Sequence, residues 1–454
     1  MRSRVALGVG CLVVALVGVG GRAQTPAADG IPTFTKDVAP ILYKNCVSCH
    51  RPGEMGPMPL ITYAQVRPYA RAISAKVTSG LMPPWHAIAP AGTFRNERRL
   101  DDAERDTIVK WAANRGPQGD PNDLPPVPQF VQGWAIGQPD AVVSMTKEFD
   151  VPASGTIDYQ YFEMPTNFTE DKWVQAIEIR PGSTAVVHHV LVYARDPNNT
   201  QRPTPFTMLP PANPAPPRPE DAARLAAAAE RQRARSGQGG PQEQVAGSPG
   251  VNRGVLIATT APGTNAVVFD PGTALLIKAG SILTFQVHYT ANGSAAKDRS
   301  SVGFVFAKQP APQEIRASAF VNARFALAPG KADQQVEAAI EFNEASHIWA
   351  LFPHTHLRGK SWEYRLVYPD GRSQVVLSVP NYDFNWQTYY QYATPFAAPK
   401  GSRLEAVAVY DNSSANRANP DPKVEVRWGE QTWEEMQYSG ITFTVDNPKA
   451  AAQQ

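Results

Sequence analysis

Two cysteines and a histidine lie close together near the start of the chain, in the run Cys46-Val47-Ser48-Cys49-His50. This is the spacing of covalent haem attachment, in which two thiols add to the vinyl groups of the porphyrin and the adjacent imidazole is held beneath the iron. Thioredoxin-like redox sites and zinc sites share the cysteine spacing. The adjacent histidine, in a chain with only three cysteines, favours one covalent haem c held by Cys46 and Cys49, with His50 as an iron ligand.

Several residues are candidates for the second axial ligand of this haem. Met82 lies in the run Leu81-Met82-Pro83-Pro84-Trp85-His86, whose prolines stiffen the loop. The run resembles the methionine–proline ligand loop of small bacterial cytochromes c, so Met82 is the predicted ligand. Met55, Met58 and His86 are the alternatives, and packing is the ordinary role of a single methionine.

Five of the histidines in the second part of the chain fall into three compact clusters: His188-His189, His288 and His354-Thr355-His356. Residues two apart in a strand face the same side, so His354 and His356 can converge on one ion. Adjacent strand residues face opposite sides, so joint ligation by His188 and His189 requires a bulge or a strand end. The alternative is that one of that pair is buried in the core. Imidazole suits copper, zinc and iron alike.

Taken in order, these clusters resemble the copper type II, ascorbate-dependent monooxygenases, the family of the peptidylglycine α-hydroxylating and dopamine β-monooxygenases. The resemblance spans about residues 140–447. The matching runs are Val187-His188-His189-Val190, Val287-His288-Tyr289, His354-Thr355-His356-Leu357-Arg358-Gly359-Lys360 and Glu435-Met436.

The resemblance implies two copper ions on two β-sandwich domains that face a shared cleft. His188, His189 and His288 would hold an electron-transfer copper. The second copper would bind dioxygen and be held by His354, His356 and Met436, which are then the catalytic ligands. A thioether is a soft ligand that favours Cu(I), in agreement with this assignment. The implied reaction inserts one oxygen atom into a substrate C–H bond and reduces the other to water.

The chain departs from the family at positions that bear on the substrate. Peptide-amidating members have an arginine two residues before the His-Thr-His motif, where this chain has Phe352. They have asparagine and tyrosine after the methionine ligand, where this chain has Tyr438 and Gly440. Glycine-extended peptides are therefore a poor match, and the expected substrate is a small organic molecule of unknown identity. An aromatic run either lines an apolar pocket or packs in a core: Tyr382, Phe384, Trp386, Tyr389 and Tyr390.

The haem motif is predicted to lie in a small all-α cytochrome c domain over residues 30–118. Thr35 is expected to cap the helix that leads into the motif, and Asp101 with Glu104 forms a capping box for a later helix. A linker rich in proline, glycine and aspartate follows at residues 119–139.

Short β-branched and aromatic runs separated by turn signals follow the linker. They predict two all-β domains, jelly-roll-like antiparallel sandwiches, at residues 140–310 and 311–447. Residues 197–253 interrupt the first and are rich in Pro, Ala, Arg, Gln and Gly, which predicts a disordered insertion. The expected strands include residues 184–193, 282–289, 302–306, 363–368, 404–410 and 440–445.

The first residues have the features of a secretory signal. Arg2 and Arg4 precede an apolar run over residues 5–19, and small residues flank a predicted cleavage site after Ala23. A membrane anchor is the alternative, but the run is short for a spanning helix. A lipoprotein start at Cys11 has too little apolar sequence before it. We expect a signal peptide at residues 1–23 and a periplasmic or secreted protein with no membrane span after cleavage.

The charge of the chain narrows its partners. Its 43 basic and 41 acidic residues give a net charge of +2, which provides no electrostatic reason to expect nucleic acid or an anionic membrane surface. The expected partners are the substrate, dioxygen, and ascorbate or a redox protein as electron donor. The haem is expected to feed the coppers, replacing or supplementing ascorbate. The alternative is a non-catalytic periplasmic haem and copper protein that carries electrons or binds copper.

Overall fold

A computed structural model of the chain describes residues 30–52, 54, 56–130, 133–197, 204–216, 254–260, 266–309, 311, 313–429 and 431–446. The predicted signal peptide and Met55 lie outside these residues. Within them, no helix has both the length and the apolar character needed to cross a membrane.

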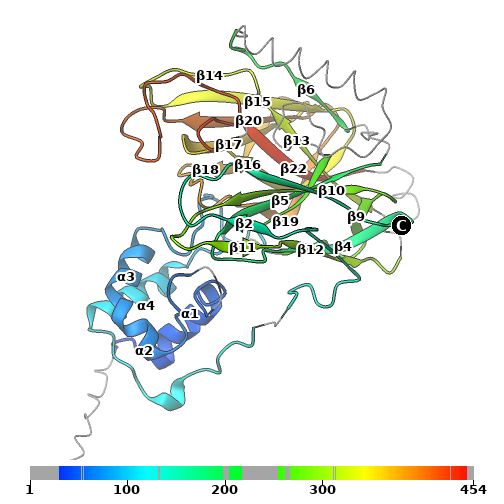
Figure 1. Cartoon of the computed structure of the whole chain (residues 1–454). Helices are drawn as coiled ribbons and strands as arrows, with labels where there is room; N and C mark the ends of the chain where they lie inside the picture. Colours follow the sequence, from blue (N-terminus) through cyan, green and yellow to red (C-terminus); the bar gives the residue numbers. More distant parts are fainter. Residues whose placement is uncertain are drawn as a thin grey trace, which may run out of the picture.

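The helices of the described chain all lie before residue 124. They form a group of their own beside the β-sheets (Figure 1). The longest, α4, has 12 residues. They share one core, which contains Phe34, Leu42 and Trp111. The elements are the π-helix η1 (Phe34–Val38), α1 (Ala39–Asn45), α2 (Tyr63–Val66), the 3₁₀-helix η2 (Arg67–Tyr69), α3 (Ala70–Thr78), α4 (Asp102–Ala113) and the 3₁₀-helix η3 (Pro121–Asp123).

The helix starts agree only in part with the predictions. The prediction that Thr35 caps the first helix is wrong, because η1 begins at Phe34 and its N-cap is Thr33. Thr35 is instead buried, and its hydroxyl donates to the carbonyl of Gln118 at 3.0 Å, a long-range contact that has no local sequence signal. The capping box of Asp101 and Glu104 is confirmed at the start of α4, where each side chain accepts the other's backbone N–H.

The rest of the described chain is mostly strand, as predicted. The predicted strand at residues 282–289 matches β10, and the other five agree within a few residues. The strands are β1 (Ala141–Ser144), β2 (Phe149–Val151), β3 (Gln160–Pro165), β4 (Lys172–Arg180), β5 (Val187–Arg195), β6 (Phe206–Leu209), β7 (Val255–Thr260), β8 (Ala266–Val268), β9 (Thr273–Ile277), β10 (Ile282–Tyr289), β11 (Ala296–Asp298), β12 (Ser301–Phe306), β13 (Gln313–Val321), β14 (Ala326–Leu327), β15 (Gln334–Phe342), β16 (Ser346–His354), β17 (Gly359–Val367), β18 (Ser373–Val379), β19 (Tyr390–Ala398), β20 (Arg403–Tyr410), β21 (Val426–Arg427) and β22 (Tyr438–Val445).

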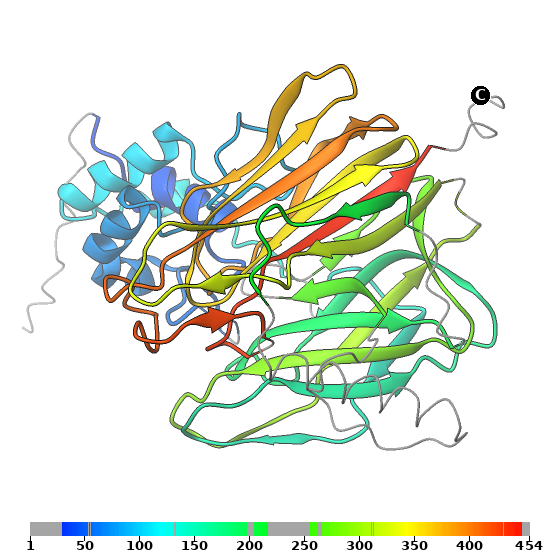
Figure 2. The same ribbon diagram turned by 90° about the horizontal axis from the view of Figure 1, so that it is seen from above.

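One long sheet runs through both halves of this β region. Its order is β1-β12-β4-β9-β13-β22-β16-β19, with β8 beside β4, and the parallel pair β9–β13 joins the halves. The sheet β3-β10-β5-β7 packs on the first half and the sheet β18-β17-β20-β15-β6 on the second, each around its own hydrophobic core. Figure 2 shows the green strands of the first half beside the yellow to red strands of the second.

Part of the predicted insertion is ordered. Within residues 204–216, β6 pairs antiparallel with β15 and extends the five-stranded sheet. Phe206 is only 5% exposed, in the core of the second half. The prediction of disorder is therefore wrong for residues 204–216, where an apolar run covers the edge of a sheet. Residues 198–203 and 217–253 of the insertion lie outside the described residues.

The segment after the predicted haem ligand Met82 attaches the helical part to the β part. Trp85 packs edge-on against Tyr390 of β19, with ring centroids 5.2 Å apart. Phe94 stacks on Tyr392 at 5.2 Å and forms a β-bridge with it. These aromatic side chains belong to the core of the second β half. The helical part is therefore fixed to the β part by buried contacts as well as by the linker.

Trp85→Ala should lower the free energy of unfolding of the β part by about 3–5 kcal/mol, because it leaves a large cavity in a shared core. Urea unfolding followed by far-ultraviolet circular dichroism measures this change. The control is Trp433→Ala, which removes a tryptophan that is 44% exposed and should change the free energy by less than about 0.5 kcal/mol. Equal effects of the two substitutions would contradict the buried attachment.

Candidate metal centres

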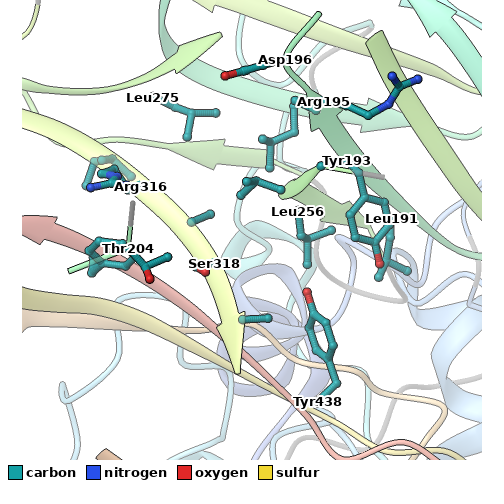
Figure 3. A pocket seen from close by; sticks show the side chains of 18 of the residues that line it. Leu191, Tyr193, Arg195, Asp196, Thr204, Leu256, Leu275, Arg316, Ser318 and Tyr438 are labelled. Carbon is teal, nitrogen blue, oxygen red and sulfur yellow. The ribbon is translucent and has the colours of Figure 1, made fainter. Parts of the chain in front are cut away.

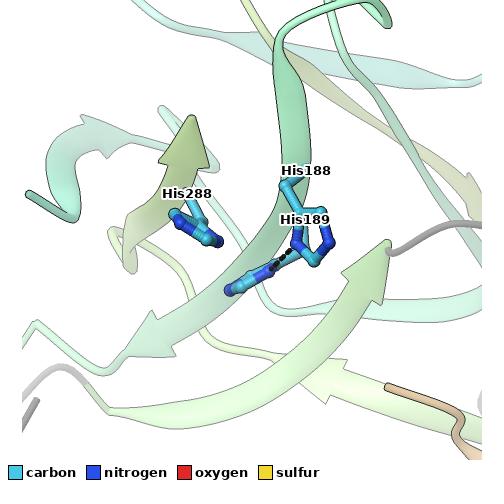
Figure 4. A group of neighbouring side chains, drawn as sticks. All are labelled: His188, His189 and His288. Carbon is cyan, nitrogen blue, oxygen red and sulfur yellow. Dashed lines mark hydrogen bonds between the residues drawn. The ribbon is translucent and has the colours of Figure 1, made fainter. Parts of the chain in front are cut away.

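Three histidines from two neighbouring strands converge on one point (Figure 4). His189 of β5 pairs directly with His288 of β10, but the next residue of β10, Tyr289, pairs with Val187. His188 is therefore the extra residue of a bulge, which brings its side chain round to the side of its neighbour. One ring nitrogen from each histidine lies within 4.8 Å of the others. The bulge that joint ligation required is present; we call His188, His189 and His288 the histidine triad.

Burial keeps the triad uncharged. It lowers the pKa of His189 well below its usual value, and the neighbouring histidines act in the same direction. Burial, followed by His188, lowers the pKa of His288 to about 3. Nδ1 of His288 is buried and has no hydrogen-bond partner among the described residues. Neutral imidazoles with an unpaired buried nitrogen are a donor set that fits a transition-metal ion.

A second group, His354 and His356, lies at the end of β16; we call it the histidine pair. The rings are 5.2 Å apart. Nδ1 of His354 lies 2.9 Å from Oε1 of Gln387, and Nδ1 of His356 lies 3.1 Å from the carbonyl of Glu434. Both partners are acceptors, so each Nδ1 carries the proton and each Nε2 is left to bind a metal. Nε2 of His356 is buried without a hydrogen-bond partner in the described chain.

Met436 lies near the pair because both flank the end of one ladder. His354 lies opposite Tyr438 in the last pair of the β16–β22 ladder, so His356 follows and Met436 precedes that pair by two residues each. Met436 and His354 line the same cavity. Two imidazoles and a thioether form a donor set that fits copper.

Glu435, next to Met436, fixes the backbone of the second group. Its fully buried carboxylate accepts the N–H groups of His356 at 2.8 Å and Arg358 at 2.6 Å. Burial raises the pKa of Glu435 to about 7, although these N–H groups act in the opposite direction. One carboxylate thus joins the turn that carries His356 to the segment that carries Met436. The resemblance matched this glutamate but gave it no role.

A cavity of about 650 Å³ opens beside the pair, between the two β halves (Figure 3). His354, Met436 and Tyr438 belong to its lining, and the lining contains none of the triad. Arg316 lies in the lining opposite Phe443 of β22, five residues along that strand from Tyr438. The aromatic run at residues 382–390 is absent from the lining of this large cavity.

Two aromatic side chains contact both groups of histidines. Phe384, from the aromatic run, packs against rings of the triad and of the pair, while Tyr390 of the same run is a core residue. Tyr159 also reaches both groups. Sequence reasoning missed Tyr159, because it precedes β3 outside any motif and only the tertiary fold brings it to the histidines.

The haem motif lies at the end of α1. Cys46 and Cys49 are free, half-buried thiols. Burial, followed by Cys49, raises the pKa of Cys46 to about 12. Nδ1 of His50 lies 3.1 Å from the carbonyl of Met58, which leaves Nε2 for the iron. Met58 is therefore on the His50 side, a poor place for the opposite ligand.

The surroundings of these thiols fit an anionic group. Half-buried Arg98 is close enough to Cys49 for their charges to interact, and burial lowers its pKa. Within the described chain, no hydrogen bond or ion pair engages its guanidinium. A haem brings two propionates that could supply the missing counter-charge. Half-buried Met82 remains the predicted second ligand.

Glu435→Gln should destabilise the protein by roughly 1–3 kcal/mol, because the amide can accept only one of the two buried N–H groups and presents a donor to the other. Chemical denaturation measures this change. The control, Glu363→Gln, removes an exposed carboxylate paired with Arg365 and should cost less than about 1 kcal/mol. A Glu435 variant as stable as the control would refute the positioning role.

Comparisons with known proteins add little. No protein-family model and no curated protein matches the chain. Solved structures with some likeness include the major capsid protein P2 of bacteriophage PM2, at 10% identity and a TM-score of 0.27, covering 68% of this chain and 98% of that one. Another is PBCV-1 VP54 fitted into a reconstruction of the virophage Sputnik, at 8% identity and a TM-score of 0.20, covering 70% and 97%. TM-scores this low carry no argument about fold or function.

Proposed function

We propose that this chain is an exported copper-dependent monooxygenase. It hydroxylates a C–H bond of a small organic substrate with dioxygen, and its electrons come from the fused c-type haem, from ascorbate, or from both. The observation that carries the proposal is the convergence of the histidine triad, whose ring nitrogens lie within 4.8 Å of one another. The histidine pair and Met436 also support the proposal. They follow the triad in the sequence, as the family resemblance requires, and His354 and Met436 line a cavity.

The two groups suit different tasks. The triad offers three nitrogen ligands and does not line the large cavity, which suits an electron relay better than a substrate site. His354 and Met436 face that cavity, so a metal held there is accessible to a substrate. Bound copper would supply the one-electron chemistry and the reaction with dioxygen. The protein positions the ligands, keeps the imidazoles neutral and limits the access of water.

The cavity supports a substrate with an apolar body. Leu191, Leu256 and Ala317 are among the residues that line it. Phe352, where a carboxylate-binding arginine stands in peptide-amidating relatives, is fully buried and stacks on His354 at 5.9 Å. No cation occupies that position, so a substrate carboxylate beside the reacting copper would lack a partner.

The fold of both parts of the chain agrees with this proposal. The two-layered halves of the β region agree with a pair of jelly-roll-like sandwiches. The short helices around the Cys46-to-His50 motif agree with a small cytochrome c domain. Haem attachment to this motif takes place outside the cytoplasm, which agrees with export to the periplasm or the exterior.

The position of the helical part supports its role as electron donor. His86 and His188 both lie within the electrostatic range of Asp383, so the docked segment and the triad approach the same loop. The helical part, which would carry the haem, therefore docks close to the triad through His86. The rival function, a non-catalytic electron carrier, would have no use for a cavity at the second group.

Met436→Leu keeps the side-chain volume but removes the sulfur ligand. We expect one copper ion per chain instead of two and no product carrying an oxygen atom from isotopically labelled dioxygen, while haem reduction is unchanged. Metal analysis and mass spectrometry of pooled extracts after incubation measure these effects. Met164→Leu, at a buried methionine outside the cavity lining, is the control and should retain both copper ions and product. Labelled product from the Met436 variant would rule out this catalytic centre.

The electron supply can be tested with dioxygen. The haem of the copper-loaded protein is reduced without oxygen, and dioxygen is then added with an extract that yields labelled product. We expect the ferrous haem absorbance to be lost as product forms. A Cys46→Ala, Cys49→Ala variant, which cannot attach haem, should form product only with added ascorbate. Product formation while the haem stays reduced would exclude the haem as donor.

A further inference from the structure

Two buried aromatic rings fill the space between the triad and the pair. The ring of Tyr159 lies 4.9 Å from that of His288 and 6.4 Å from that of His356, both edge-on. The ring of Phe384 lies 5.9 Å from that of His188, stacked, and 6.1 Å from that of His356. Each ring therefore contacts both groups.

Both rings are held in place. Tyr159 is 6% exposed, and its backbone N–H donates to Oε1 of Gln431, in the segment that leads to Met436. Phe384 is 8% exposed and lies in the loop between β18 and β19.

Both ends of that loop are tied to the pair. The hydroxyl of Tyr382 donates to the carbonyl of Thr355 at 2.8 Å, and Oε1 of Gln387 accepts from Nδ1 of His354. A movement of the loop that took Phe384 out of the gap would therefore break the hydrogen bonds of Tyr382 or Gln387. The same loop contains Asp383, whose charge acts on His188 of the triad and on His86 of the docked helical part.

Both rings are buried, so packed side chains lie in the gap between the groups. A hydrated gap would reorganise whenever charge moved across it, whereas packed rings do not. Packed atoms also transmit an electron over a given distance better than a gap of the same width. The arrangement has the properties needed to connect two redox centres.

We propose that Tyr159 and Phe384 form an aromatic bridge, through which one electron passes from a metal held by the triad to a metal held by the pair. This inference rests on the proposed function. The transfer would move a single electron, so that a copper held by the triad would change from Cu(I) to Cu(II) and a copper held by the pair from Cu(II) to Cu(I). No bond or proton changes. The two residues are positioning residues, because they contact the ligands and not the reacting atoms.

The test uses the full-length, haem-containing protein loaded with copper and fully oxidised. One electron per chain is delivered to the haem by photoreduction without oxygen. Haem absorbance reports the first transfer, to the triad. Rapid-freeze electron paramagnetic resonance reports the second transfer, from the triad to the pair, as a loss of the cupric signal of the pair. That signal is assigned as the one that is missing from the spectrum of Met436→Leu.

We compare the double variant Tyr159→Leu, Phe384→Leu with two controls. Tyr159→Phe keeps the ring and removes only the hydroxyl. Phe320→Leu removes a buried ring that contacts no histidine of either group in the described structure. We expect the double variant to bind two copper ions and to complete the first transfer normally, but to slow the second by roughly tenfold or more. Both controls should retain the wild-type rate of the second transfer.

The outcomes separate the bridge from the enzyme. If wild type binds no copper at the two groups, the proposed function fails and the bridge fails with it. If wild type transfers the electron and the double variant does so equally fast, only the bridge is overturned. Loss of copper from the double variant would assign the rings a packing role and would also overturn the bridge.

Discussion

The alternation of side chains along a strand is the constraint on which the first metal centre depends. In a regular ladder His188 and His189 would face opposite sides of the sheet, and at most one could reach His288. The register shift between β5 and β10 removes this conflict by inserting one residue on β5 alone. The bulge leaves some ladder groups of β5 without their regular partners, and the gain is three imidazoles on one side of the sheet.

The second centre solves a different problem, because its ligands are far apart in the sequence. His354 ends β16 just before the turn that contains His356, and Met436 precedes β22. The antiparallel register of β16 with β22 aligns the two segments, and the carboxylate of Glu435 fastens the irregular backbone beyond the ladder. A charged group buried this deeply is costly unless its oxygens are satisfied, and here backbone N–H groups satisfy them.

The parts of the molecule that the sequence predicted are those with local signals. The β-branched and aromatic run of β10, the capping box of α4 and the need for a bulge at His188 all depend on residues close together in the chain. The missed features join distant residues: the parallel β9–β13 pair, β6 on the edge of β15, and Tyr159 between the histidines. None of these contacts leaves a periodic or compositional trace at either of its ends, so only the folded chain brings them out.

The loop between β18 and β19 connects the three functional parts. Its side chains contact different neighbours. Phe384 packs on both histidine groups, and Gln387 accepts a hydrogen bond from His354. The next strand, β19, receives Trp85 and Phe94 from the helical part through Tyr390 and Tyr392. Because these contacts are buried, a shift of the helical part would be transmitted to the loop rather than absorbed by solvent. The docking of the helical part and the positions of the metal-binding histidines therefore depend on the same set of packed side chains. A change in one is expected to shift the other.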